Sequence, residues 1–329
     1  MNDWGRSVLE QYPVTVYGVK KGRGVLILDT DRGCKILQEY RGSKRHMEAE
    51  DRILSFLKEE RGLLVDAYVR TKGGELSATN EDGVQYILKD GFLFTECNVG
   101  SRGELETAVR MLAKLHMLLR GMDSREIPDR TGLVGNSLVD EMEKHNRELK
   151  RIRAFIRNKK KKTGFELCIM KSFDTMYAQA EEALHLLYDS QYQKLYKDAV
   201  GQGHICHGSY NQHNVLLHSG QVAVINFQHI SIQMQIFDLY QFMRKILEKH
   251  NWSLELGSMM LEDYNRILPI SKEESRILRA MFLYPEKYWK QMNFYYSSNK
   301  AWIPQRNIDK LKHAADQYTV RTAFLNHVL

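Results

Sequence analysis

The segment around His207 carries polar side chains whose spacing suits phosphoryl transfer. It runs His207-Gly208-Ser209, and Asn214 follows five residues after the serine. Loops that transfer phosphate to small molecules have Asp at the serine position, where it accepts the proton of the attacking hydroxyl, and the Asn helps to hold Mg²⁺. An uncharged serine hydroxyl is a poor proton acceptor near pH 7. The segment therefore has the form of a catalytic loop without its catalytic carboxylate.

A second position that should carry charge follows this loop. Phosphotransfer sites of this kind have Ile-Asp-Phe there, and this chain has Ile225-Asn226-Phe227. A neutral amide can coordinate Mg²⁺, but this hard cation normally relies on carboxylates and phosphates. Asn214 and Asn226 are thus the predicted metal positions, both of them uncharged.

The lysine that should hold the nucleotide phosphates is also missing. In the strand that runs from Gly33 to Tyr40, Gln38 stands at the lysine position. Alternate residues of a strand face opposite ways, so Lys35 points away from the face that Gln38 shares with Ile36. Glu50, on the following helix, is the predicted partner of that lysine, and we expect it to be left without one.

Two residues near the loop are predicted to support it. Asp238 lies twelve residues after Asn226. In the phosphotransfer pattern this Asp holds the catalytic loop by hydrogen bonds, and His207 belongs to the same frame. Alternatively, Asp238 is an acidic residue that the dipole favours in the first turn of a helix.

Histidines and cysteines also crowd this part of the chain. They are His204, Cys206, His207, His213, His218 and His229. A transition-metal site is a third interpretation, but the spacing matches no established ligand pattern. The four cysteines, Cys34, Cys97, Cys168 and Cys206, form no Cys-x-x-Cys pair, which indicates free thiols.

The elements that must position these residues fall into two groups. Strands and tight turns are predicted up to residue 96, with turns at 30–33, 81–83 and 89–91, a last strand at 92–96, and one helix at about 44–57. Helical periodicity begins at Gly103, and Gly121 is its predicted stop. Two long helices follow at about 137–160 and 166–188, then the loop at 204–214, a hairpin at 215–226 and further helices.

This order predicts an α+β fold of the two-lobed protein-kinase-like type. Residues 1–96 make a small antiparallel-sheet N-lobe, and residues 97–329 make a larger helical C-lobe that carries the catalytic-loop hairpin. One kinase-like unit results.

Composition narrows the function classes. The 329 residues carry a net charge of +7, with no apolar run long enough to span a membrane and no secretory signal, so synthesis inside the cell is expected. Ten Lys/Arg and one Glu fall within residues 144–162. This segment is either a patch for an acidic partner or a solvated helix end. The segment lacks the interleaved series of aromatic residues that a nucleic-acid platform requires, so no nucleic acid is expected.

Several segments together resemble the CotS-type spore coat proteins, relatives of the aminoglycoside and choline kinases. The resemblance covers nearly the whole chain and rests on residues 37–42, 112–116, 150–162, 207–214, 225–227, 237–239, 284–289 and 300–304. The segments Tyr284-Pro285-Glu286-Lys287-Tyr288-Trp289 and Lys300-Ala301-Trp302-Ile303-Pro304 are the most specific to that family.

The resemblance implies a kinase-like protein made in the mother-cell cytoplasm and deposited in the spore coat, with other coat proteins as partners. Because Ser209, Asn226 and Gln38 all depart from the pattern, we predict a pseudokinase with a scaffolding role and no cofactor. The C-terminal aromatics Tyr288-Trp289 and Tyr295-Tyr296 are either partner contacts or core. The alternatives are an active small-molecule phosphotransferase that uses ATP and Mg²⁺, and a sensor that binds nucleotide without turnover.

Overall fold

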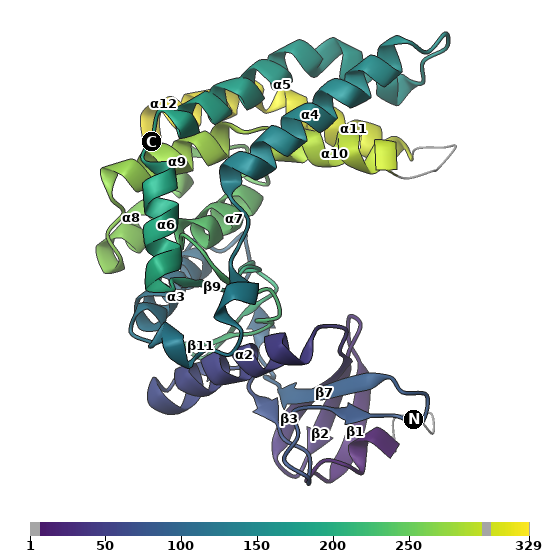
Figure 1. Cartoon of the computed structure of the whole chain (residues 1–329), viewed down its shortest axis with the longest axis vertical. Helices are drawn as coiled ribbons and strands as arrows, with labels where there is room; N and C mark the ends of the chain where they lie inside the picture. The colour runs from purple at the N-terminus through teal and green to yellow at the C-terminus, as the bar shows by residue number, and fades with distance from the viewer. Residues whose placement is uncertain (1–6, 298–303, 329) are drawn as a thin grey trace. The chain divides into compact units, whose positions relative to one another are not determined.

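A computed structural model describes residues 7–297 and 304–328. They form two compact units, which we describe separately (Figure 1). The first unit joins the chain up to Val134 with Val200–Asp238, and the second joins Gly135–Ala199 with the chain from Leu239 onward. The division expected between residues 96 and 97 therefore does not coincide with either boundary, because the catalytic-loop hairpin forms sheets with strands of the N-terminal segment.

Every strand of the described residues belongs to the first unit. Its larger sheet has the antiparallel order β1-β2-β3-β7-β5, and β6 also pairs with β7. These strands are β1 Val16–Lys21, β2 Leu26–Thr30, β3 Gly33–Glu39, β5 Tyr68–Val69, β6 Ala78–Thr79 and β7 Gln85–Asp90. One face packs against Val8, Leu9 and Tyr12.

The opposite face of this sheet packs against helix α2, Lys44–Ser55. Ser43 begins the helix by accepting the His46 N–H at 3.1 Å, which satisfies one of its free amides. Met47 packs against Tyr40 and Ile87 of the sheet. The π-helix η1, Phe56–Glu60, continues α2, so the helix predicted at 44–57 is confirmed.

A second sheet carries the catalytic-loop hairpin and has the order β4-β11-β10-β8. Its strands are β4 Leu64–Val65, β8 Thr95–Glu96, β10 Val215–His218 and β11 Gln221–Val224. Strand β4 runs parallel to β11, and the other pairs are antiparallel. The short strands β9, Ile205–Cys206, and β12, Ser231–Ile232, form a third sheet.

Two sequence predictions at this point are wrong. The turn predicted at 89–91 is the end of β7, and the strand predicted at 92–96 shrinks to β8, which pairs with β10 rather than with the larger sheet. Lys-Asp-Gly has the composition of a turn, but the ladder to β3 continues as far as Asp90.

Helices complete both units. In the first lie α3 Arg102–Arg120, η2 Ser124–Glu126 and η3 Arg130–Leu133, and Gly121 ends α3 as predicted. The second is built from α4 Leu138–Arg157, α5 Gly164–Tyr188, α8 Leu254–Ile267, α9 Lys272–Leu283, α10 Glu286–Ser297, α11 Gln305–Asp316 and α12 Tyr318–Val328. Helices α6, Tyr192–Gln202, and α7, Ile236–Leu247, contain the points where the chain passes between units. The α+β prediction is confirmed.

Helix α5 begins with a capping box in which Thr163 and Glu166 bond reciprocally. Within the second unit, Tyr288 is buried and belongs to the core, whereas Tyr296 is half exposed. The family-specific segment at 300–304 lies outside the described residues except for Pro304. Among the described helices, none combines the length and apolar composition needed to cross a membrane.

Candidate active site

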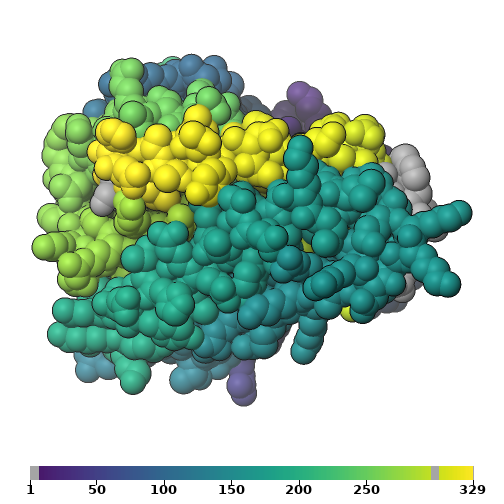
Figure 2. Space-filling model, turned by 90° about the horizontal axis from the view of Figure 1, so that it is seen from above, coloured from purple at the N-terminus to yellow at the C-terminus, as the bar shows by residue number. Residues whose placement is uncertain are grey.

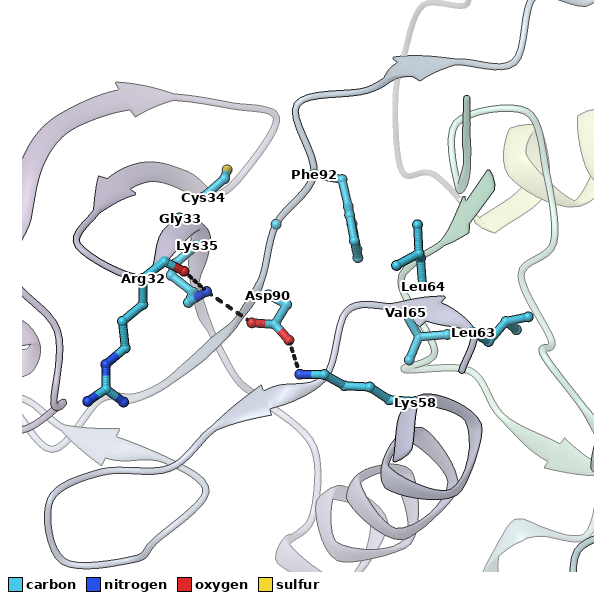
Figure 3. Close-up of a pocket in the computed structure, with 11 residues that line it drawn as sticks. Arg32, Gly33, Cys34, Lys35, Lys58, Leu63, Leu64, Val65, Asp90 and Phe92 are labelled. Atoms are coloured by element: carbon cyan, nitrogen blue, oxygen red, sulfur yellow. Dashed lines mark hydrogen bonds and ion pairs between the residues drawn. The ribbon is translucent and has the colours of Figure 1, made fainter. Parts of the chain in front are cut away.

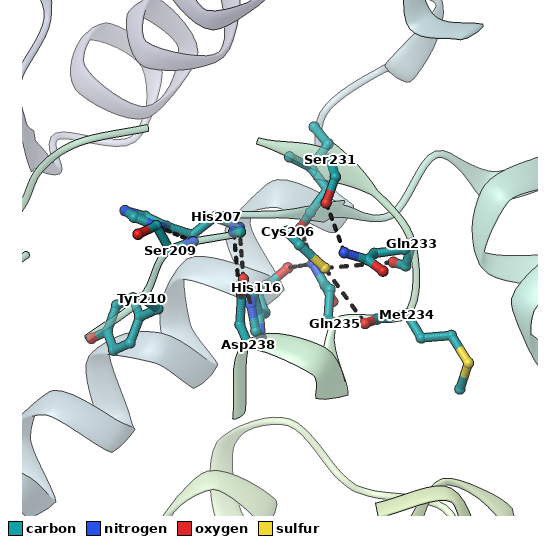
Figure 4. A network of polar contacts seen from close by, with 12 residues as sticks. His116, Cys206, His207, Ser209, Tyr210, Ser231, Gln233, Met234, Gln235 and Asp238 are labelled. Carbon is teal, nitrogen blue, oxygen red and sulfur yellow. Dashed lines mark hydrogen bonds and ion pairs between the residues drawn. The ribbon is translucent and has the colours of Figure 1, made fainter. Parts of the chain in front are cut away.

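Asp238 holds the backbone of the catalytic loop. Its buried carboxylate accepts the N–H groups of His207 at 2.6 Å and Gly208 at 2.9 Å, and a hydrogen bond from His116 Nε2 at 3.1 Å (Figure 4). Burial opposes ionisation, but the bond and charge of His116 outweigh it and hold the pKa of Asp238 below its usual value. Asp238 thus makes the hydrogen bonds that its predicted supporting role requires.

His207 belongs to the same frame and is fixed in one tautomer. Its Nε2 lies 3.0 Å from the carbonyl oxygen of Ile225, and its Nδ1 accepts the Ser209 N–H at 3.1 Å. The proton therefore sits on Nε2. Complete burial lowers the pKa of His207 to about 4, so the ring is neutral at pH 7. It orients the loop and the Ile225 segment.

Gly208 is required by the close approach of two loops. Its φ of +75° lies in the left-handed region, and a Cβ there would stand 1.8 Å from the carbonyl oxygen of His229. No side chain can be accommodated without moving one of the two loops.

Ser209, Asn214 and Asn226 come together as the sequence predicts. The Asn214 Nδ2 donates to the Ser209 carbonyl at 2.8 Å and lies 3.5 Å from its hydroxyl. The Asn214 Oδ1 lies 3.5 Å from the Asn226 Nδ2. Asn226 has a φ of 68°, a conformation that Asn tolerates better than most residues and that is enriched at functional sites. The three residues thus lie together, and the groups that they bring to one place are neutral.

This donor set does not fit a Mg²⁺ ion. The two amides that should hold the metal face each other, and within residues 7–297 and 304–328 no carboxylate is hydrogen-bonded to either amide side chain. The Asp66 carboxylate directs Oδ2 to the Asn226 N–H at 2.9 Å and to Lys89 at 3.0 Å. Because Mg²⁺ demands several hard, preferably charged oxygens in octahedral geometry, neutral amides bonded to each other are a poor substitute.

A lysine missed by the sequence reasoning lies close to this centre. Lys89 of β7 is 2% exposed, and its ammonium contacts Glu50 Oε1 at 2.5 Å and Asp66 Oδ2 at 3.0 Å. Tyr68 donates to Glu50 Oε2 at 2.8 Å. The expectation that Glu50 lacks a lysine partner is therefore wrong: the partner comes from the neighbouring strand.

Strand register explains why Lys89 can take this place. Lys89 pairs with Ile36, and Ile87 pairs with Gln38, in the antiparallel ladder between β7 and β3. Opposite residues of such a ladder share a face, so Lys89 lies on the same face as Gln38. The alternation along β7 could have revealed it, but the turn composition of residues 89–91 concealed it.

The charges of this cluster do not cancel. Burial works against the Lys89 ammonium, but Asp66 and Glu50 outweigh it and raise the pKa of Lys89. Burial also raises the pKa of Asp66, whose Oδ1 is buried without a hydrogen-bond partner. Two carboxylates thus share one ammonium, which the raised pKa keeps charged.

Lys35 faces the other side of the sheet, as alternation predicted. Its ammonium donates to the Arg32 carbonyl at 2.6 Å and contacts Asp90 Oδ1 at 3.1 Å (Figure 3). Lys58 holds the other oxygen of Asp90 at 2.6 Å. These residues line a small cavity of about 210 Å³ that also includes Phe92. Lys35 therefore cannot replace the lysine missing at Gln38.

The transition-metal interpretation gains no support. Across residues 7–297 and 304–328, no three His, Cys, Asp or Glu side chains converge in a way that could hold a metal ion. The sulfur of Cys206 instead contacts the carbonyl oxygens of Gln233 and Met234.

Comparison with known proteins agrees with this frame. Spore coat protein S of Bacillus subtilis (strain 168) is 21% identical over 319 residues, which cover 91% of this chain and 86% of that protein. The fold matches an aminoglycoside phosphotransferase from Alicyclobacillus acidocaldarius with a TM-score of 0.86 at 18% identity, covering 98% and 94% of the two chains. It also matches a spectinomycin phosphotransferase solved with ADP and spectinomycin, with a TM-score of 0.66 at 11% identity and coverage of 95% and 94%.

These matches confirm the kinase-like fold, and at such low identities the structural ones show the fold alone. The model of one protein family matches residues 6–328, which is nearly the whole sequence. Its description connects the kinase-like fold with the spore coat. The chain belongs to the family described as spore coat putative kinase YutH.

Proposed function

We propose that this spore coat kinase-like protein is a pseudokinase that acts as a scaffold in coat assembly. One observation carries the proposal: Asp238 and His207 hold the catalytic loop in place while Ser209 and Asn226 supply no charge at its centre. A loop that keeps its supporting hydrogen bonds but lacks the charged groups for phosphoryl transfer fits a structural role better than a catalytic one. A kinase fold alone does not imply kinase activity.

The family supports the setting in which such a scaffold acts. Its description supports deposition in the spore coat, and we propose synthesis in the mother-cell cytoplasm and other coat proteins as partners. The basic segment at 144–162 is the surface we assign to an acidic partner.

A nucleotide sensor without turnover is the second candidate. The buried pair of Lys89 with Glu50 favours it, because a lysine paired with a helix glutamate is the arrangement that kinases use on ATP phosphates. An active phosphotransferase, like the relatives with known structures, requires in addition that other groups replace the lost carboxylates.

Calorimetric titration of the purified protein with ATP, with and without Mg²⁺, separates these candidates. The scaffold proposal predicts no binding at millimolar nucleotide under either condition. Saturable binding that Mg²⁺ does not strengthen, without hydrolysis, supports the sensor. Tight Mg²⁺-dependent binding overturns the pseudokinase proposal.

Restoring the missing charged side chains is a second test of the pseudokinase proposal. We expect Ser209→Asp with Asn226→Asp to show no robust Mg²⁺-dependent ATP turnover, and turnover to require Gln38→Lys as well. If the double variant is active, Lys89→Met in its background identifies the cause. If circular dichroism shows that this variant is still folded, its loss of activity assigns the phosphate contact to Lys89, and the importance given to Gln38 is wrong.

A further inference from the structure

The positive charge of the chain is concentrated in one part of the second unit. Residues 144–162 carry ten Lys/Arg and one Glu, a net charge of +9, whereas the whole chain carries +7, so the remaining residues are net negative by two. The segment comprises most of α4 and the loop into α5. Figure 2 shows these two helices in teal beside the yellow C-terminal helices, with long side chains projecting from the surface.

Only part of this charge is neutralised within the protein. Arg147, Lys150, Arg153 and Lys159 pair with Glu143, Glu181, Asp174 and Glu166 respectively. For Lys144, Arg151, Arg157, Lys160 and Lys161, the described part of the chain provides no carboxylate within ion-pair distance. The segment therefore presents excess positive charge to a partner.

Some of these positive side chains line a groove between α4 and α5. Its volume is about 570 Å³, and it is lined by Lys150, Arg153, Ala154, Arg157, Asn158, Phe173 and Tyr177. The α4 residues recur at intervals of three and four, so they share one face of the helix, with the small Ala154 between the long cations. The α5 residues are one turn apart, and their rings stack 5.3 Å from centre to centre.

The aromatic rings hold the cations in place. The Arg153 guanidinium lies 4.6 Å from the centre of the Phe173 ring, and the Lys150 ammonium lies 5.1 Å from that of Tyr177. Arg153 Nε is buried without a hydrogen-bond partner, and the residue's ion-pair partner Asp174 is 80% exposed. The groove thus presents positioned cations to an incoming carboxylate, and Arg157 is the one among them that has no carboxylate partner in the described part of the chain.

We infer that this groove binds an extended acidic peptide segment of a partner protein, with carboxylates at alternate positions. From Lys150 to Arg157 the helix rises about 10 Å, the length of about three extended residues. Arg153 and Arg157 are one turn apart, a rise of about 6 Å, and alternate side chains of an extended peptide are separated by a similar distance. This inference names the partner chemistry of the proposed scaffold and rests on that proposal.

The same contacts argue against nucleic acid as the occupant. Non-specific binding of single strands uses aromatic faces on which bases stack. Here the cations cover Phe173 and Tyr177, and Phe173 is 1% exposed. A peptide with several carboxylate side chains, which needs no aromatic faces for stacking, fits the groove better.

Fluorescence anisotropy with the full chain tests the inference. The probe is a labelled peptide with the repeat Glu-Ala-Glu-Ala-Glu, and the control peptide has Gln in place of each Glu. We expect saturable binding of the acidic peptide only. Arg157→Glu should weaken binding about tenfold or more, because a charge-assisted contact becomes a repulsion. Arg151→Glu, which makes the same charge change on another face of α4, should weaken it less than about threefold.

Three results overturn the inference: no saturable binding, equal losses in the two variants, or competition by a single-stranded oligonucleotide of equal charge at equal concentration. ATP titration of the Arg157→Glu protein keeps the two proposals apart. Its outcome should match that of the wild type, so a failure of peptide binding leaves the pseudokinase result standing.

Discussion

At the scale of single residues, the centre of the loop carries neutral groups, and a charge cluster is buried beside it. Ser209 and Asn226 keep the shape of the site. Lys89 joins Glu50 and Asp66 through two buried ion pairs. A buried charge of this kind is costly to leave without its partner.

The substitution Lys89→Met should therefore destabilise the fold strongly. Removing the ammonium leaves Glu50 and Asp66 buried beside each other, and we expect a loss of about 3–5 kcal/mol in the free energy of unfolding. Urea denaturation measures it. Lys58→Met, at the more exposed pair with Asp90, is the matched control and should cost about 1 kcal/mol or less. Equal losses in both variants would refute the structural role of Lys89.

Prediction from sequence was uneven at this scale. The positions of Ser209, Asn214, Asn226 and Asp238 followed from one linear motif, because short loops fix spacing locally. The contact of Lys89 with Glu50 depends on the β3–β7 register, which pairs Lys89 with Ile36, 53 positions before it. No local pattern encodes that pairing.

At the scale of elements, the same distinction holds. Helix α2 was predicted within a few residues because its cap and its apolar stripe are local signals. Strands β9 and β12 were not predicted, since each has two residues and exists only through pairing with the other, more than twenty residues away. The end of β7 was missed because its composition favours a turn.

The catalytic loop as an element depends on Gly208. Gly208→Ala should cost about 3 kcal/mol or more, because both a left-handed backbone and a clash with the His229 carbonyl must be accommodated. Gly220→Ala is the control: its φ is +80°, but no atom lies within 4 Å of the added Cβ, so about 1 kcal/mol is expected. Thermal denaturation of both variants compares them. A similar shift in the two would contradict the tight approach of the loops.

At the scale of the whole molecule, the buried frame makes stability depend on acid. Folding excludes a proton from His207, whose pKa falls to about 4 from the ordinary 6.5. The stability that depends on neutral His207 is fully present above pH 6.5 and is lost as the pH falls toward 4. In that range the unfolded chain binds a proton at His207 and the folded chain does not. The size of this effect is about 3 kcal/mol.

Urea denaturation at pH 7, 5.5 and 4 checks this dependence. In the His207→Gln protein, the fall in unfolding free energy over this range should be about 3 kcal/mol smaller than in the wild type. If His207→Gln leaves the slope unchanged, the buried neutral imidazole is not the origin of the acid sensitivity.

The four-stranded sheet β4-β11-β10-β8 has a consequence for motion. Both edges of the catalytic-loop hairpin are paired, one with a strand beside α2 and the other with the strand that precedes α3. Ligand-binding loops usually belong to the least stable part of a protein and open locally. Here the hairpin cannot open without separating from both neighbours, so its amide hydrogens belong to the same slowly exchanging group as those of the strands on either side.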